Sequence, residues 1–188
     1  MSLAPSLAVP NLLTAEQFGQ RPDLGHPEEL VRGRIVPMPV PQSRHGQICG
    51  NAYFLIRSHT SVHDLGHVLS NDSGVITERG PDTVRGADVA FYSYARVPKG
   101  PLPPGYLQVA PELVVEVVSP SDRWPKVLAK AAEYLEAGVS VVIVLDDERD
   151  SAMVFRANES ARGFESGDEL TVPDLLPGFS VAVRRFFE

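Results

Sequence analysis

The chain has 188 residues, of which 17 are lysine or arginine and 24 are aspartate or glutamate, so its formal net charge is −7. This length suits one domain, and 43% hydrophobic and 22% charged residues are typical of a globular chain rather than a disordered one or a coiled coil. The charge excludes a global positive field that would attract nucleic acid or anionic lipid. The single cysteine, Cys49, cannot form an internal disulfide and favours the cytoplasm, and no stretch resembles a signal peptide or a membrane span.

The N-terminal third predicts an arm, a short helix, a hairpin and a longer helix. Residues 1–12 contain two prolines and little pattern, which indicates a poorly ordered arm, and one folded domain is expected over 13–188. Thr14, with Gln17 three residues later, has the spacing of a capping box and predicts a helix over 14–19. Apolar runs around Arg32 and Gly33 predict a β-hairpin. Apolar residues at three- and four-residue spacings then predict a largely buried helix over 45–59.

The remaining sequence alternates strands with one clear helix. Asn71 and Asp72 predict a turn between two strands. Pro125 in the first turn and Gly138 after the end predict a helix over 124–137. The predicted strands cover residues 68–70, 74–77, 84–92, 113–119, 139–145 and 151–156, with two more in the tail, 170–187, around a turn at Pro177 and Gly178. This order predicts an α/β fold of the mixed α+β kind, in which a central mixed β-sheet is flanked by helices.

Two acidic residues stand within the predicted strands. Glu116 has Val114 and Val118 as same-face neighbours, and both faces of its strand are apolar. A carboxylate buried there needs a metal ion, a lysine or an arginine beside it, unless the strand end reaches solvent. Asp88 is similar, one strand earlier, although a turn at the start of that strand explains it equally well. Carboxylates that converge from neighbouring strands are ligands that Mg²⁺ or Mn²⁺ prefers.

Three polar residues share one face of the helix that follows Glu116. Lys126, Lys130 and Tyr134 have i, i+4, i+8 spacing, and the connection from the preceding strand is short. This face can lean over the carboxylates, where a lysine would neutralise charge on a phosphate. A solvated lysine face is the alternative, and it suits Lys126 better than Lys130.

The ordered set of these residues resembles the Uma-type restriction endonuclease family, a branch of the PD-(D/E)XK nuclease superfamily. The resemblance extends over nearly the whole chain from Thr14. It is carried by residues 29–33, 41–46, 85, 88–91, 111–123, 130, 133–135, 137–139, 145–146 and 176–179.

The resemblance implies a restriction-endonuclease-like fold with N-terminal β-hairpin elements and a site for Mg²⁺ (or Mn²⁺). The motif aspartate of the family falls on Asp88 and its motif acid on Glu116. The family's lysine does not occur at Val118 and is placed on the following helix, as Lys130. Glu29 matches an N-terminal acidic residue that completes the metal site in such nucleases. The implied reaction is metal-assisted hydrolysis of phosphodiester bonds in DNA.

The resemblance also implies residues that contact the substrate. His45 matches the family and is expected to touch the phosphate or to cap its helix. A homodimer is expected by analogy, because two strands must be cut with one site per chain. Such a dimer would assemble a local basic groove from Arg32, Arg34, Arg44, Arg79, Arg85, Arg123 and Lys126. The expected substrate-binding residues are His45, Arg85, Arg123, Lys126 and Tyr134.

Two departures and two alternative functions accompany this interpretation. Ala87 replaces a usual proline, and residues 142–143 replace a usual aromatic residue, but neither change removes a catalytic group. A catalytically inactive module that binds nucleic acid or protein remains an alternative, favoured by the acidic charge. A zinc hydrolase built on His59, His63 and His67 is a weaker one, because those residues would need a single long helix.

Overall fold

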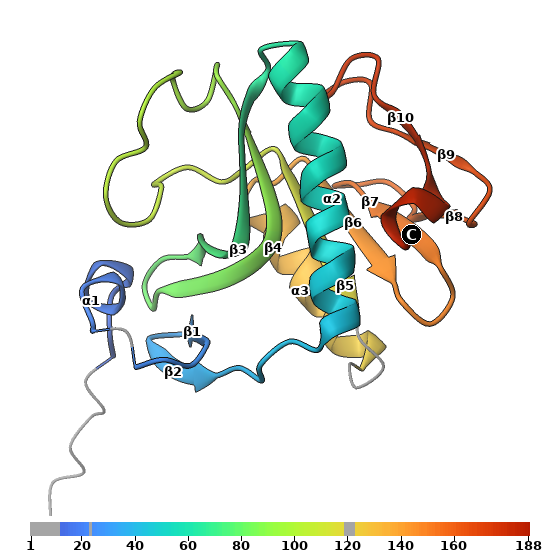
Figure 1. Ribbon diagram of the computed structural model, residues 1–188. Helices are drawn as coiled ribbons and strands as arrows, with labels where there is room; N and C mark the ends of the chain where they lie inside the picture. Colours follow the sequence, from blue (N-terminus) through green and yellow to red (C-terminus); the bar gives the residue numbers. More distant parts are fainter. Residues whose placement is uncertain (1–11, 23, 119–122) are drawn as a thin grey trace, which may run out of the picture.

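The computed structural model describes residues 12–22, 24–118 and 123–188 (Figure 1). The predicted arm lies outside the described residues except for Leu12, and so does Ser119 at the end of a predicted strand. Among the described residues, no helix is long and apolar enough to cross a membrane. The elements are α1 (Ala15–Gly19), β1 (Glu28–Val31), β2 (Arg34–Pro37), α2 (Ser43–Val62), β3 (Gly66–Glu78), β4 (Thr83–Ser93), β5 (Leu113–Val118), α3 (Trp124–Glu136), β6 (Val141–Asp146), β7 (Ser151–Phe155), β8 (Arg162–Phe164), β9 (Glu169–Thr171), β10 (Ser180–Ala182) and the 3₁₀ helix η1 (Val183–Phe186).

One mixed sheet of eight strands confirms the predicted fold class. Its order is β2-β1-β4-β5-β6-β7-β8, and β3 pairs with the other edge of β4. Among the strand pairs that the structure describes, β5 with β6 is the parallel one, and α3 supplies the crossover that a parallel pair needs. The remaining pairs are antiparallel, and β9 with β10 forms a separate two-stranded sheet. The predicted hairpin is confirmed as β1 and β2.

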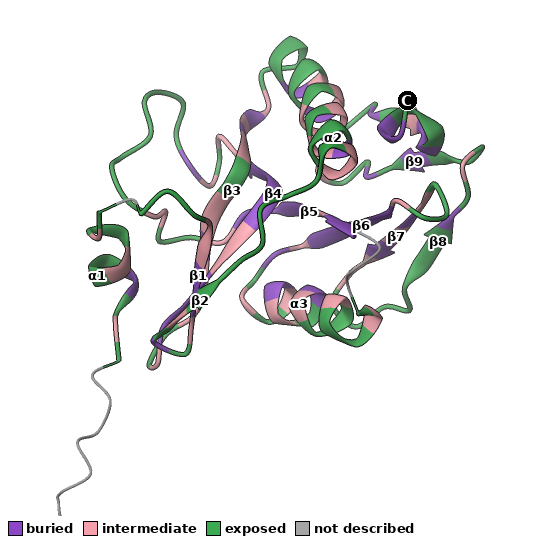
Figure 2. Cartoon of the chain, turned by 60° about the horizontal axis from the view of Figure 1, so that its bottom comes forward, coloured by how far each residue is buried: buried purple, intermediate pink, exposed green. Residues whose placement is uncertain are grey.

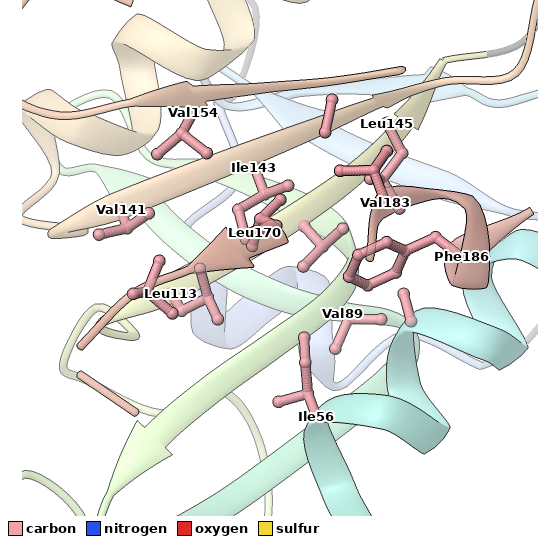
Figure 3. Packing of buried hydrophobic residues seen from close by; sticks show 14 of the residues in the cluster. Ile56, Val89, Leu113, Val141, Ile143, Leu145, Val154, Leu170, Val183 and Phe186 are labelled. Carbon is pink, nitrogen blue, oxygen red and sulfur yellow. The ribbon is translucent and has the colours of Figure 1, made fainter. Parts of the chain in front are cut away.

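The two long helices cover opposite faces of the sheet (Figures 1 and 2). On one face, Ile56 of α2, Val89 of β4 and Phe186 of η1 belong to a core that also includes β5, β6 and β9 (Figure 3). On the other face, Ala131 and Tyr134 of α3 pack on apolar residues of β4, β5 and β6. Because β5 and β6 are covered on both sides, their runs of valine and leucine are buried throughout, with Glu116 as the exception.

Two predicted elements differ from the structure. The helix expected to be largely buried over 45–59 is α2, and only a stripe at four-residue spacing is buried, namely Ile48, Ala52, Ile56 and Thr60. Phe54 and Val62 on its outer side are 65% and 81% exposed. The number of apolar residues in this helix therefore led to an overestimate of how much of it is buried. The last strand of the tail is short, because the chain turns into η1 after Ala182. The strand β8 was not predicted.

The predicted turn at Asn71 and Asp72 is instead a bulge within one long strand. Strand β3 pairs with β4 on both sides of this point, and the register shifts between Ser70 and Ser73. Asn71 and Asp72 have φ angles of 65° and 52°, a left-handed conformation that asparagine and aspartate adopt more readily than most residues. Residues that favour a turn are therefore accommodated here in a bulge of the strand. The bulge borders the pocket described below, which Asn71 and Asp72 help to line.

Helix α1 begins with the predicted capping box. The Thr14 hydroxyl accepts a hydrogen bond from the Gln17 N–H at 3.2 Å, and the Gln17 side chain accepts one from the Thr14 N–H at 2.9 Å. Replacing Thr14 by alanine removes one acceptor, and we expect the free energy of unfolding to fall by about 1 kcal/mol. Urea denaturation checks this value, with Thr14→Ser, which keeps the hydroxyl, as the control. Equal stability of the alanine and serine variants would contradict the expectation.

Candidate active site

The candidate site lies where β4 changes its partner strand. On the same edge, β4 pairs with β1 at Val84 and with β5 from Val89 onward, so residues 85–88 lie between the two ladders. Buried backbone groups need hydrogen-bond partners, and here acidic side chains supply them. The Gly86 N–H donates to Glu29 Oε1 at 3.1 Å. Carboxylates of this region thus accept hydrogen bonds from backbone N–H groups that the interrupted ladder leaves without a strand partner.

Asp88 occupies this gap and faces both β5 and α2. Its Oδ2 accepts a hydrogen bond from the Val117 N–H at 2.7 Å, and its Oδ1 lies 3.2 Å from Nε2 of His45. The Asp88 side chain is only 8% exposed. Burial raises the pKa of Asp88, but the hydrogen bond and charge of His45 and the Val117 N–H outweigh it, so the pKa is lowered overall. Asp88 is therefore ionised at neutral pH.

Glu116 lies beside Asp88 and is held by two residues of α3. Val89 pairs with Val115, and the Asp88 side chain accepts its hydrogen bond from the N–H of Val117, the residue that follows Glu116. Lys130 Nζ donates to Glu116 Oε2 at 2.8 Å, and the Tyr134 hydroxyl donates to Oε1 at 2.8 Å. Burial raises the pKa of Glu116 to about 7, although Lys130 opposes this rise. Glu116 is thus a carboxylate whose charge the protein only partly compensates.

Lys130 joins Glu116 to a second carboxylate. Its Nζ also donates to the Gly86 carbonyl at 3.0 Å and lies 3.4 Å from Glu29 Oε1. Burial lowers the pKa of Lys130, but the Glu116 and Glu29 carboxylates outweigh it and raise the pKa above its ordinary value. Lys130 therefore keeps its positive charge at neutral pH. The predicted residues Asp88, Glu116, Lys130 and Glu29 all contribute to this one network.

Arg85 connects a further carboxylate, that of Glu133, to the network. Its guanidinium donates to Glu29 Oε2 at 2.8 Å and to both oxygens of Glu133, at 2.9 and 2.7 Å. Glu29, Glu116 and Glu133 pair with Arg85 or Lys130, and Asp88, which contacts His45, also interacts electrostatically with Lys130. When Glu116 is ionised, these four carboxylates outnumber the positive charges of Arg85, Lys130 and a protonated His45. The excess of negative charge suits a bound divalent cation.

The expected substrate-binding residues differ in their placement. Tyr134 is fully buried, and Arg85 is engaged by two carboxylates, so the geometry favours a positioning role for both. Lys126 and Arg123 are exposed at the start of α3, and the His45 ring contacts Asp88. Four of the seven residues expected to form a basic groove are already in ion pairs with acidic side chains, which reduces the positive charge they offer to a phosphate. They are Arg32, Arg44, Arg79 and Arg85.

A pocket of about 260 Å³ opens beside Asp88. It is lined by α2 residues, among them His45, Cys49 and Tyr53, and by the bulge of β3 at Asp72. Partial desolvation and then the Asp88 charge raise the pKa of Asp72. The sequence analysis had not assigned Cys49 or Asp72 to the site. The i, i+4 spacing of His45 and Cys49 on one predicted helix was the signal available for the cysteine.

The residues whose potential metal-ligand atoms lie close together differ from the predicted trio. Among the described residues, one set of three brings its ligand atoms within 4.8 Å of one another, and it consists of His45, Cys49 and Asp88. The expected trio of Asp88, Glu116 and Glu29 does not form such a set. The Glu29 oxygens are occupied by the Gly86 N–H and Arg85.

The zinc site proposed from three histidines is wrong. Helix α2 ends at Val62, so His67 lies on β3 rather than on the same helix face. The ring nitrogens of His59, His63 and His67 instead lie 3.0–3.1 Å from the carbonyl oxygens of Pro177, His59 and Pro98. These rings bind backbone carbonyls and do not converge on a common point.

The comparisons with known proteins agree with this architecture. A crystal structure described as "a putative nuclease belonging to DUF820" from Anabaena variabilis superposes with a TM-score of 0.80 at 20% sequence identity, and the match covers 93% of this chain and 97% of that chain. A search of the curated proteins finds no match. The fold places the molecule in the class of restriction-endonuclease-like proteins. The model of the Uma2 family, described as "Putative restriction endonuclease", matches residues 15–184, so the chain belongs to this family.

Proposed function

We propose that this protein is an endonuclease that uses Mg²⁺ or Mn²⁺ to hydrolyse phosphodiester bonds of DNA. The observation that carries the proposal is that two carboxylates, Asp88 and Glu116, interact electrostatically at a break in the sheet, with Lys130 donating to Glu116 at 2.8 Å. Family membership and the nuclease-like fold support it.

The donor set fits a hard divalent cation. Carboxylate oxygens are its preferred ligands, and when Glu116 is ionised the network has more negative than positive charges. Asp88 and Glu116 would hold the ion, which when bound polarises a phosphoryl oxygen and acidifies a water molecule. Because the Glu29 oxygens are occupied by Arg85 and Gly86, we assign Glu29 a positioning role toward Lys130.

The other side chains of the network position the two carboxylates or stabilise charge on the substrate. His45 keeps Asp88 ionised and fixes its rotamer through the 3.2 Å contact. Tyr134 orients Glu116 by donating to its second oxygen. Lys130 remains protonated next to the carboxylates, and its charge would stabilise the negative charge that develops on a phosphate in the transition state. We extend the proposal to a homodimer, since one such network per chain serves one strand of a duplex.

The first test combines metal binding with cleavage. We expect calorimetry to detect Mn²⁺ binding to the wild type and at least a tenfold weaker affinity in Asp88→Asn, because a buried ligand is lost. Wild-type cleavage of supercoiled plasmid should require Mg²⁺ or Mn²⁺ and stop in EDTA. Asp64→Asn is the matched control, since Asp64 is exposed and pairs with Lys99 on the surface.

The same experiment tests the alternative of an inactive binding module. The acidic net charge and the paired arginines are the observations that favour this alternative. A wild type that binds no Mn²⁺, even with DNA present to complete the coordination, would overturn the nuclease proposal and leave the binding module as the better explanation.

A further inference from the structure

Three different metal-ligand types meet on the pocket side of the network. His45 and Cys49 are one turn apart on α2, so their side chains lie on one face of that helix. Asp88 of β4 faces them, and its Oδ1 lies 3.2 Å from His45 Nε2. One ligand atom from each of the three residues lies within 4.8 Å of the other two.

This spacing is close to what a tetrahedral ion requires. With Zn²⁺ bonds of about 2.0–2.3 Å, ligand atoms lie roughly 3.3–3.8 Å apart, so side-chain shifts of about 1 Å or less suffice. Helix α2 packs into the core on this side through Ile48, which lies between the two α2 ligands, and through Ala52, which follows them. The adjoining pocket of about 260 Å³ leaves room for water or a substrate atom as the fourth ligand.

The chemistry of the set distinguishes it from the carboxylate pair. Thiolate and imidazole favour Zn²⁺, Co²⁺ and similar ions, whereas Mg²⁺ prefers oxygen ligands alone. We propose that His45, Cys49 and Asp88 form a second metal site, which takes a thiophilic divalent ion such as Zn²⁺. The site shares Asp88 with the proposed Mg²⁺ site, so the two ions compete for one carboxylate.

The protonation state of Cys49 is compatible with this site. Burial and the nearby negative charge of Asp88 raise the pKa of the Cys49 thiol, so the metal-free protein holds it as a thiol. A bound dication reverses this electrostatic effect and deprotonates a coordinating thiol. Binding therefore releases a proton from Cys49, and it partly neutralises the cluster that faces the pocket.

Competition at Asp88 has a functional consequence that rests on the proposed nuclease activity. An ion held by His45 and Cys49 draws the Asp88 oxygen away from the Glu116 side. Zn²⁺ would then inhibit cleavage that Mg²⁺ supports, and Cys49→Ser would reduce the fold-inhibition by Zn²⁺. Because Cys49 lines the pocket beside Asp88, the inhibition of each protein is expressed relative to its own activity in Mg²⁺ alone.

Spectroscopy with Co²⁺ tests the site without any assay of activity. Cys49 is the only cysteine of the 188 residues, so a thiolate-to-cobalt charge-transfer band has a single possible source. We expect this band at one Co²⁺ per chain, and we expect Zn²⁺ to abolish it by displacement. Cys49→Ser should lack the band, and His45→Ala should weaken Co²⁺ binding at least tenfold. Absence of the band in the wild type would overturn the site. So would a His45→Ala variant that shows the band and binds Co²⁺ with wild-type affinity.

A further variant separates this inference from the proposed function. Glu116→Gln removes a ligand of the proposed Mg²⁺ site and leaves His45, Cys49 and Asp88 in place. We expect it to retain the cobalt–thiolate band, and loss of the band in a folded variant would contradict a site that is independent of Glu116. A protein that shows the band but never cleaves DNA refutes the nuclease proposal alone. Cleavage that Zn²⁺ inhibits equally in wild type and Cys49→Ser refutes the competition.

Discussion

Glu116→Gln is expected to lower the rate of plasmid cleavage in Mg²⁺ by more than about 100-fold while the protein stays folded. A metal-stabilised transition state gains several kcal/mol, and each 1.36 kcal/mol corresponds to a tenfold change in rate. The amide keeps the size of the side chain but removes the negative charge beside Asp88. The network can still be satisfied, because the amide oxygen accepts from Lys130 and its NH₂ donates to the Tyr134 oxygen, whose hydroxyl then turns to the Gly86 carbonyl 3.3 Å away.

The same substitution should change how stability depends on pH. In EDTA, burial raises the pKa of Glu116 from 4.5 to about 7, so between these values the folded protein keeps a proton that the unfolded chain releases. The wild type therefore loses stability as the pH rises through this window, by roughly 3 kcal/mol in total. The glutamine variant lacks this loss. At pH 8 we expect its stability to lie within about 1 kcal/mol of the wild type, since Lys130 loses an ionic partner in exchange.

Cleavage assays and urea denaturation at pH 5 and pH 8 measure both parts of this expectation. Glu136→Gln is the matched control, because Glu136 is exposed at the end of α3 and the chemical change is identical. The control should keep wild-type activity and the wild-type pH dependence. Undiminished cleavage by Glu116→Gln would remove Glu116 from the reaction, whatever its stability.

The parts of the site predicted from sequence depend on local periodicity. The alternation of β5 placed Glu116 among valines, and this required a buried partner. The i, i+4 spacing of Lys130 and Tyr134 on α3 supplied two partners, and both contact Glu116. Lys126 has the same spacing but lies in the first turn of the helix and is exposed, so periodicity alone did not separate it from the other two.

The remaining parts depend on contacts between distant segments. Glu29 meets Arg85 only because β4 pairs with β1 at Val84 before it turns to β5, and no local pattern specifies that change of partner. Arg85 was expected to face substrate, since a sequence shows its charge but not the carboxylates around it. Asp72 was assigned to a turn, because a bulge and a turn favour the same residues.

Lys130→Met is expected to reduce the free energy of unfolding by about 3–5 kcal/mol at pH 8, the usual effect of removing one partner from a buried ion pair. The Lys130 Nζ lies 2.8 Å from Glu116 Oε2 and 3.4 Å from Glu29 Oε1. Methionine fills a similar volume but leaves Glu116 as an uncompensated charge. At pH 5 the loss should be smaller, because Glu116, whose pKa is already raised to about 7, is then protonated. Urea denaturation at the two pH values measures the difference.

A double variant decides whether the lost stability comes from charge or from packing. In Lys130→Met with Glu116→Gln the unpaired carboxylate is gone, and Glu29 still pairs with Arg85 at 2.8 Å. We expect this double variant to recover at least half of the loss at pH 8, which is a favourable coupling between the two positions. Lys126→Met, on the exposed face of the same helix, should change stability by less than about 0.5 kcal/mol. If the two substitutions at 130 and 116 are instead additive, Lys130 stabilises the fold by packing, and the charge network does not determine its role.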